Sequence, residues 1–165
     1  MEADMTDRDI LAGKKILAVD DEEDVLAVIE EQLESCILVK AKRYDTAKDL
    51  LEKESYDLAV LDIMGVRGFD LLDIATRKKI PAVMLTAHSV TPDSLQKAID
   101  KGALSFLPKD ELVRLAELIA EVLEEAEKGR THWAKLKSRL GGRFEELWGE
   151  MWQEIKFPRD PNISW

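Results

Sequence analysis

Carboxylates that directly follow apolar runs are the first residues of this chain that could do chemistry. The run ILAV ends in five consecutive acidic residues that begin with Asp20 and Asp21, and the run LAVL ends at Asp62. A carboxylate at the end of a buried strand is costly unless solvent, a helix N-terminus or a cation compensates for its charge. Carboxylate oxygens of this kind suit a hard cation such as Mg²⁺.

Two other polar residues occupy the same position relative to later apolar runs. Thr86 ends the run VML, and Lys109 follows FLP. If these runs are parallel strands of one sheet, their carboxyl ends lie along one edge, where such folds bind their ligands. Three carboxylates, a hydroxyl and an ammonium group then converge on one rim. The sequence therefore predicts a cation site there, with Lys109 offsetting part of the negative charge.

The elements that must position these residues alternate along the chain. Apolar runs predict strands at residues 15–19, 37–41, 56–64, 81–87 and 103–109, and amphipathic patterns predict helices at residues 21–35, 45–55, 68–79, 91–102 and 110–128. We expect Asp45, Thr91 and Asp110 to be helix N-caps. Five short βα units in succession indicate an α/β fold, a doubly wound five-stranded parallel sheet with helices on both faces.

Composition narrows the class of protein. The chain has 165 residues, of which 45% are hydrophobic and 35% charged, and its formal net charge is -10. This balance is typical of a globular protein and argues against nonspecific binding to nucleic acid or anionic membranes. The single cysteine, Cys36, cannot form an internal disulfide. Without a signal peptide or an apolar stretch of membrane-spanning length, we expect a cytoplasmic protein with neither nucleic acid nor a membrane as partner.

Four segments, in this order and on these elements, carry a resemblance to a known family. The segments are ILAVDDE, YDLAVLDIM, VMLTA and GALSFLPK. Together they resemble the receiver domain of bacterial two-component response regulators, the CheY-like phosphoacceptor modules with a flavodoxin-like sheet. The resemblance implies a receiver domain at residues 14–128 and leaves residues 129–165 as a C-terminal helical extension.

The resemblance also implies a role for each residue at the acidic rim. Asp62 would be the phosphoacceptor, and Lys109 would pair with the phosphoryl oxygens. The cofactor would be Mg²⁺, bound by Asp21 directly, by Asp20 partly through water, by Asp62, and by the backbone carbonyl of Met64. Charge neutralisation of this kind is what phosphoryl transfer chiefly requires.

Three further residues match the family's switch. Thr86 would hydrogen-bond a phosphoryl oxygen and shift inward, and Phe106 would turn into the space that Thr86 vacates. Ala87 would be the small residue that leaves room for the phosphoryl group. A phosphoryl group that binds one of two conformations better would shift the population between them.

Two departures from the family pattern lie close to this site. The segment DIMGVRGFDLL is about two residues shorter than usual and lacks the family's proline. Asp110 follows Lys109 where the family has a cis proline. The altered loop predicts an unusual Mg²⁺ affinity or phosphoryl lifetime, whereas the geometry of the Lys109–Asp110 bond is left open by the sequence.

The resulting functional hypothesis is a phosphoacceptor response regulator, with a histidine kinase or a phosphotransfer protein as its phosphodonor. It would not be an enzyme, apart from its own phosphorylation and dephosphorylation. The alternative is a phosphorylation-independent interaction module with the same fold. A phosphatase that uses Asp62 as nucleophile is disfavoured, because Met64 stands where a second carboxylate would act as acid or base.

Residues 129–165 are too few for most DNA-binding or enzymatic output domains, so output through protein–protein contacts is expected. The pattern predicts a helix, a break at LGGRF, and a second helix with an apolar stripe from Phe144 to Ile155. The stripe must be buried, either on its own receiver or in an interface, for which a homodimer through the last helix and tail is the favoured form. The mildly basic segment RTHWAKLKSRLGGR matches no DNA-reading motif. We expect His132 at the surface and His88 in a loop.

Overall fold

The computed structural model describes residues 6–87 and 91–158, so His88 lies outside the described residues. Within these ranges five strands form one parallel sheet in the order β2-β1-β3-β4-β5. The strands are β1 Lys15–Val19, β2 Ile37–Ala41, β3 Leu58–Asp62, β4 Ala82–Thr86 and β5 Ser105–Pro108. Every residue of β3 and β4 is buried, as expected for strands covered on both faces.

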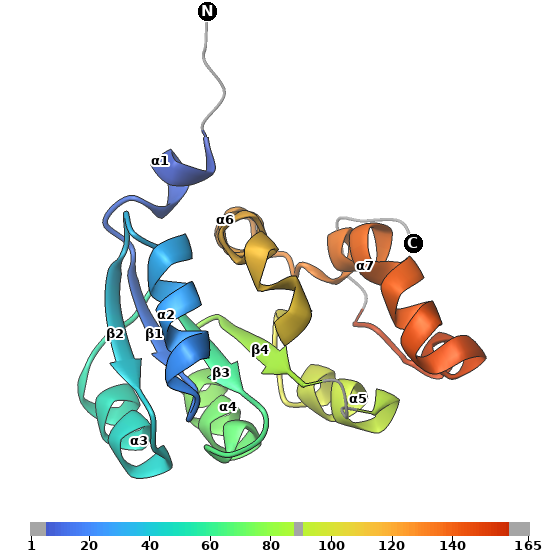
Figure 1. The fold of residues 1–165 in the computed structure, drawn as a ribbon, viewed down its shortest axis with the longest axis horizontal. Coiled ribbons are helices and arrows are strands. Elements are labelled where there is room, and N and C mark those ends of the chain that lie inside the picture. Colours follow the sequence, from blue (N-terminus) through green and yellow to red (C-terminus); the bar gives the residue numbers. More distant parts are fainter. Residues whose placement is uncertain (1–5, 88–90, 159–165) are drawn as a thin grey trace, which may run out of the picture.

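Helices cover both faces of the sheet. They are α2 Glu23–Gln32, α3 Tyr44–Lys53, α4 Gly68–Arg77, α5 Pro92–Asp100 and α6 Leu115–Glu127. Helices α2 and α6 lie on one face, and α3, α4 and α5 lie on the other (Figure 1). The predicted fold class, a doubly wound five-stranded parallel sheet with a helical extension, is therefore confirmed. In the parts of the chain that the structure describes, no helix combines the length and the apolarity needed to cross a membrane.

Of the three predicted N-caps, one is confirmed. Thr91 caps α5 by accepting a hydrogen bond from the Ser94 N–H. The prediction for Asp45 is wrong, because α3 already begins at Tyr44. The prediction for Asp110 is also wrong: a 3₁₀ helix, η1 Lys109–Arg114, begins one residue earlier and leads into α6. The described residues contain no cis peptide bond, so the Lys109–Asp110 bond is trans.

A short helix that the sequence patterns do not predict precedes the sheet. Helix α1, Asp7–Leu11, is stabilised by a capping box in which Thr6 and Asp9 satisfy each other's backbone N–H groups. Leu11 is buried, and α1 packs against α6. The signal for this helix is the T-x-x-D spacing, which precedes only one turn of apolar pattern.

The C-terminal extension forms one long helix rather than two. Helix α7, Trp133–Trp148, runs through LGGRF without interruption, so the predicted break is wrong. A Cβ atom at Gly141 would lie 3.3 Å from the ring of Trp152, so glycine is placed there for close packing. The helix ends at Trp148 and is capped by Gly149, where φ is +60°. A 3₁₀ helix, η2 Gly149–Glu154, replaces the predicted second helix.

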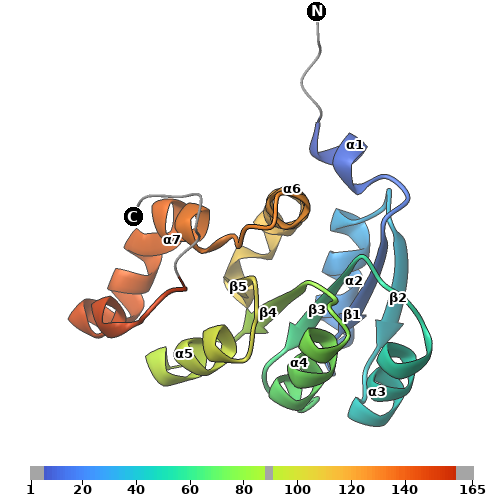
Figure 2. The ribbon, with the colours of Figure 1, turned by 180° about the vertical axis from the view of Figure 1, so that it is seen from behind.

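Helix α7 folds back on its own receiver. It lies beside β5, the edge strand of the sheet, and beyond α5 and α6 (Figures 1 and 2). The side chain of Trp133 is 0% exposed and donates its indole N–H to the Ala103 carbonyl at 3.2 Å. Gln96 of α5 exchanges two hydrogen bonds with the backbone of Lys156, at 3.1 and 2.7 Å. Of the two alternatives for the apolar stripe, the described residues adopt the first, and the homodimer stays a prediction.

His132 is buried, so its predicted surface position is wrong. It is 1% exposed, and its ring links two elements: Nδ1 lies 2.8 Å from Ser105 Oγ of β5, and Nε2 lies 2.8 Å from a Glu121 carboxylate oxygen of α6. Burial lowers the pKa of the imidazole. The fold-back of α7, which no local pattern encodes, brings His132 into this position.

Candidate functional site

The three predicted carboxylates meet at the carboxyl end of the sheet. Strand β1 pairs with β3 in parallel, with Val19 opposite Leu61, so the next residues, Asp20 and Asp62, are neighbours. Carboxylate oxygens of Asp20, Asp21 and Asp62 lie within 4.8 Å of one another. Asp20 is 0% exposed and Asp62 is 2% exposed, whereas Asp21 is exposed to solvent. Two buried acids and one accessible acid thus form a single cluster.

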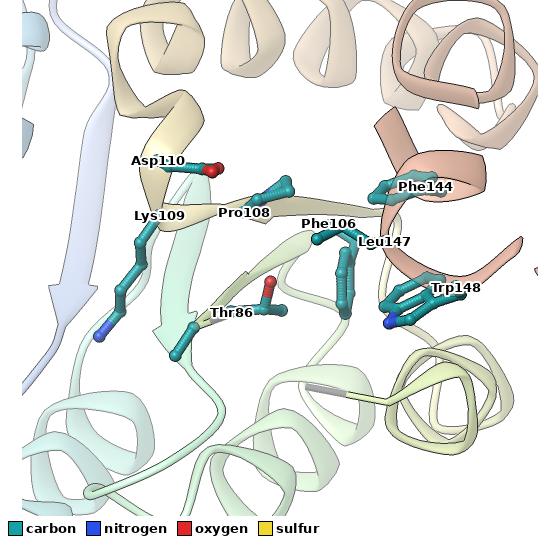
Figure 3. Close-up of a pocket in the computed structure, with 9 residues that line it drawn as sticks. Thr86, Phe106, Pro108, Lys109, Asp110, Phe144, Leu147 and Trp148 are labelled. Carbon is teal, nitrogen blue, oxygen red and sulfur yellow. The ribbon is translucent and has the colours of Figure 1, made fainter. Parts of the chain in front are cut away.

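Lys109 supplies the positive charge of this cluster. It follows β5 and reaches past β4, so that its Nζ lies 3.0 Å from Asp20 Oδ2 and 3.2 Å from Asp62 Oδ1. A weaker contact of 3.7 Å joins it to Glu22. Figure 3 shows the Lys109 side chain extended away from β5 on the side where Thr86 lies. One ammonium group is therefore shared by two buried carboxylates and cannot neutralise both.

The electrostatics of the cluster reflect this imbalance. Burial, together with the Asp20 carboxylate, raises the pKa of Asp62 to about 7, although Lys109 opposes both effects. Burial also raises the pKa of Asp20, although the Glu22 N–H, 2.9 Å from its Oδ1, and Lys109 favour its ionised form. A divalent cation among these oxygens would favour ionisation of both acids. This oxygen-only donor set, with its uncompensated buried charge, fits Mg²⁺.

The predicted switch residues line one cavity beside the cluster. Thr86, at the end of β4, is 3% exposed, and Phe106 of β5 is 0% exposed. The cavity measures about 320 Å³, and α7 contributes to its wall (Figure 3). Its lining residues are Thr86, Ala87, Phe106, Pro108, Lys109, Asp110, Phe144, Leu147 and Trp148. The roles assigned to Thr86, Ala87 and Phe106 stay predictions, but their positions join the acidic cluster to the tail.

With this geometry established, comparison with known proteins identifies the family. The family model of the response regulator receiver domain matches residues 16–128 of the chain. The chain belongs to the response regulator receiver family. The matched residues include all three carboxylates and Lys109. The receiver is a signalling domain.

Similar proteins come from plants and bacteria. The chain is 33% identical over 113 residues to the two-component response regulator ARR10 of Arabidopsis thaliana, which covers 64% of this chain and 20% of that protein. It is 32% identical over 126 residues to the transcriptional regulatory protein CpxR of Escherichia coli, covering 73% and 52% respectively. The chain spans about a fifth of the length of the first relative and about half of the second.

Solved structures give the same assignment. A CheY-like receiver domain protein from Methanospirillum hungatei superposes with a TM-score of 0.65 at 26% identity, covering 72% of this chain and 99% of that one. The receiver domain of NtrX from Brucella abortus superposes with a TM-score of 0.51 at 30% identity, covering 62% and 94%. In both cases nearly the whole solved chain corresponds to only part of this receiver protein, whose extension lengthens it.

Two glycines of the loop after Asp62 belong to the site although their types alone did not predict it. Gly65 has φ of +84°, and a Cβ atom there would lie 2.6 Å from a carboxylate oxygen of Asp21. Gly68 begins α4, and a Cβ atom there would overlap the Asp62 carbonyl oxygen. The sequence signal is the pair of glycines in the shortened segment GVRG. Met64 lies in this loop with its side chain 63% exposed, and the role of its carbonyl stays a prediction.

Replacement of Gly65 by alanine is expected to weaken Mg²⁺ binding to this receiver about tenfold, the loss typical of disturbing a residue that orients a metal ligand. The new methyl group would displace the Asp21 carboxylate. Isothermal titration calorimetry measures the effect. Gly13→Ala is the matched control, because Gly13 also has positive φ, +74°, but its Cβ would have no neighbour within 4 Å. Equal Mg²⁺ affinity in the two variants would contradict the placement of Gly65 against a metal ligand.

Proposed function

We propose that Asp62 accepts a phosphoryl group from a histidine kinase or a phosphotransfer protein of a cytoplasmic two-component relay, in a Mg²⁺-dependent reaction. The observation that supports this most is the buried carboxylate of Asp62, 3.2 Å from Lys109 and within 4.8 Å of oxygens of Asp20 and Asp21. In this proposal residues 14–128 are the phosphoacceptor module, and residues 129–165 are its helical extension.

In the proposed reaction an ionised Asp62 oxygen attacks phosphorus. A new O–P bond forms, the bond from phosphorus to the donor's histidine nitrogen breaks, and that nitrogen keeps the electron pair and takes a proton from water. Lys109 favours ionised Asp62 and then pairs with the equatorial phosphoryl oxygens, whose charge the transition state spreads. Mg²⁺ bound by Asp20, Asp21, Asp62 and the Met64 carbonyl would supply further charge neutralisation at these oxygens.

Thr86, Ala87 and Phe106 complete the proposal. Thr86 donates its hydroxyl hydrogen to a phosphoryl oxygen, Ala87 leaves room for the group, and Phe106 follows the inward movement of Thr86. Support comes from their shared cavity wall and from the burial of Thr86 and Phe106. The output is a changed protein–protein contact, with a second copy of this chain as one proposed partner through the last helix and tail.

Intact-mass spectrometry after incubation with Mg²⁺ and a small acyl phosphate tests the proposal. The wild type is expected to gain the mass of one phosphoryl group, and Asp62→Asn is expected to gain none, because an amide cannot form the acyl phosphate. Asp49→Asn is the matched control, since Asp49 lies exposed on α3 in an ion pair with Lys53. Chelation of Mg²⁺ is expected to abolish the gain.

Two results would overturn the proposed function. One is labelling that persists in Asp62→Asn. The other is no labelling of folded wild type by either the acyl phosphate or a phosphorylated histidine phosphotransfer protein, while a known receiver is labelled in parallel. The second result would favour the alternative, a phosphorylation-independent interaction module with the receiver fold.

A further inference from the structure

The N-terminal half of α7 is anchored to α6 and β5 by contacts remote from the acidic cluster. Lys135 pairs with the buried Glu125 at 3.0 Å, and Arg139 pairs with Glu117 and Glu121 of α6. Trp133 and His132 add the buried hydrogen bonds to β5 and its neighbouring turn. This half therefore has its own attachment to the receiver, through residues other than those of the acidic cluster.

The C-terminal half of α7 lies beside the carboxyl ends of β4 and β5 (Figure 3). Phe144, Leu147 and Trp148 share the wall of the cavity with Thr86 and Lys109 (Figure 3). Phe144 is 1% exposed, and its ring stacks on Trp148 with centroids 5.3 Å apart. Trp152 of η2 packs against Phe144 as well, at 5.9 Å. An aromatic cluster from the tail thus borders the same cavity as Thr86 and Lys109 of the proposed phosphorylation site.

Two links join this aromatic cluster to the site, and both start from β5 or the residue that follows it. The first is the contact between Phe106 and Phe144, whose rings meet edge to face with centroids 6.1 Å apart. The second uses adjacent residues at the start of η1. Lys109 pairs with Asp20 and Asp62, and Asp110 pairs with Arg143 of α7. Adjacent residues therefore hold the ammonium group of the acidic cluster and the carboxylate that pairs with the tail.

Phosphorylation of Asp62 would give Lys109 a new and more strongly charged ion-pair partner. A phosphoryl group adds about 1.5 to 2 negative charges and three strong acceptor oxygens. Lys109, now shared between Asp20 and Asp62, would turn toward these oxygens and carry the first turn of η1 with it. Asp110 would then move relative to Arg143, and any inward movement of Phe106 would remove the partner of Phe144.

We propose that the C-terminal half of α7, together with η2, is a cover whose docking opposes phosphorylation of Asp62, so that phosphorylation loosens this half while the N-terminal half stays attached. The proposal rests on the proposed function of Asp62. Coupling between two sites is reciprocal in free energy, so a weakened cover must favour binding of a phosphoryl group to the same degree. The tail would thereby bind, within the same chain, the surface formed by Thr86, Phe106 and Lys109.

Hydrogen–deuterium exchange of the full chain tests the coupling directly. After phosphorylation, amide exchange of residues 143–154 is expected to rise about tenfold, within the usual range of coupling between sites. Exchange of residues 133–140 is the internal control and is expected to stay within about twofold. The intact mass of the same sample reports the fraction phosphorylated. Two results would contradict the proposed cover but not the proposed function: phosphorylated protein with unchanged exchange at residues 143–154, or phosphorylated protein with equal changes in residues 133–140 and 143–154. If the chain accepts no phosphoryl group from any donor, both the proposed cover and the proposed function of Asp62 are contradicted.

The reciprocal test compares two arginines of α7. Arg143→Ala removes the contact with Asp110, whereas Arg139→Ala removes a similar guanidinium that pairs with Glu117 and Glu121 of α6. Beryllofluoride with Mg²⁺, a non-covalent phosphoryl analogue, is the probe. We expect Arg143→Ala to bind it about fivefold more tightly than wild type, and Arg139→Ala to bind it within about twofold. Unchanged binding in Arg143→Ala would contradict the link through Asp110.

Discussion

An Asp62→Asn variant is expected to be more stable than the wild type in metal-free buffer at pH 8, by about 2 to 3 kcal/mol in the free energy of unfolding. The ordinary pKa of this carboxyl is 3.8, and burial, together with the Asp20 charge, raises it to about 7 in the folded chain. A carboxyl whose folded pKa is raised favours folding fully only below its unfolded pKa. That stability is lost as pH rises through about 7, because the buried group must then ionise.

The size of the gain in stability follows from the difference between the folded and unfolded pKa of Asp62. About three pH units correspond to about 4 kcal/mol, which is an upper bound. Asparagine has nearly the same shape and never ionises, but it gives up the attraction of Lys109, whose Nζ lies 3.2 Å from Asp62 and 3.0 Å from Asp20. The net gain is therefore smaller than the bound. At pH 5 the folded carboxyl is still protonated but the unfolded one, with its pKa of 3.8, is already ionised, so roughly a third of the bound is already lost. The remaining loss of about 3 kcal/mol falls between pH 5 and pH 8, so at pH 5 the two proteins should differ by less than about 1 kcal/mol.

Urea denaturation with a chelator, at pH 5 and pH 8, measures this gain. The exposed variant Asp49→Asn should change stability by no more than about 0.5 kcal/mol at either pH. Addition of Mg²⁺ should stabilise the wild type more than Asp62→Asn, since only the wild type offers the third carboxylate. A gain at pH 5 as large as that at pH 8, or no gain at pH 8, would contradict the raised pKa and with it the electrostatic account of the site.

The acidic rim could be predicted from sequence because topology positions it. In a parallel sheet every strand ends at the same edge, so identification of the apolar runs was enough to bring Asp20, Asp62, Thr86 and Lys109 to one rim. The observed strands end at these residues or directly before them. What the sequence could not provide is the sharing of one ammonium between two buried acids, because that depends on distances across β4 and on burial. The close approach of Gly65 to Asp21 could not be predicted either, because it also depends on distances in the folded chain.

The extension was harder to predict because its structure depends on partners far away in the chain. A pair of glycines indicates a break when only local propensity is considered, yet Gly141 lies in a continuous helix because Trp152 packs on it. Asp110 has a good N-cap side chain, but it pairs with Arg143, 33 positions later. His132 carries no sign of burial in its neighbours, and only the docking of α7 on β5 places it between Ser105 and Glu121.

Because Trp133 anchors α7 to the receiver, we expect its replacement to destabilise the protein more than any other substitution in the extension. Trp133→Ala is expected to lower the free energy of unfolding by about 3 to 5 kcal/mol, the usual range for deletion of a fully buried large aromatic side chain. The side chain is 0% exposed, and its N–H is paired with the Ala103 carbonyl, which would be left without this donor. Trp133→Phe keeps most of the ring and should cost less. Trp152→Ala, at a partly exposed position, is the control and should cost less than Trp133→Ala.

Urea denaturation at several protein concentrations measures this loss and tests how the apolar stripe is buried. If α7 docks on its own receiver, the unfolding midpoint of the wild type is independent of protein concentration, and Trp133→Ala lowers it at every concentration. If two chains instead bury their tails against each other, the midpoint rises with concentration, because association is then part of folding. A concentration-dependent midpoint together with a small effect of Trp133→Ala at low concentration would contradict the fold-back and favour the homodimer. The proposed cover requires docking within one chain, because the tail must respond to phosphorylation of Asp62 in the same molecule.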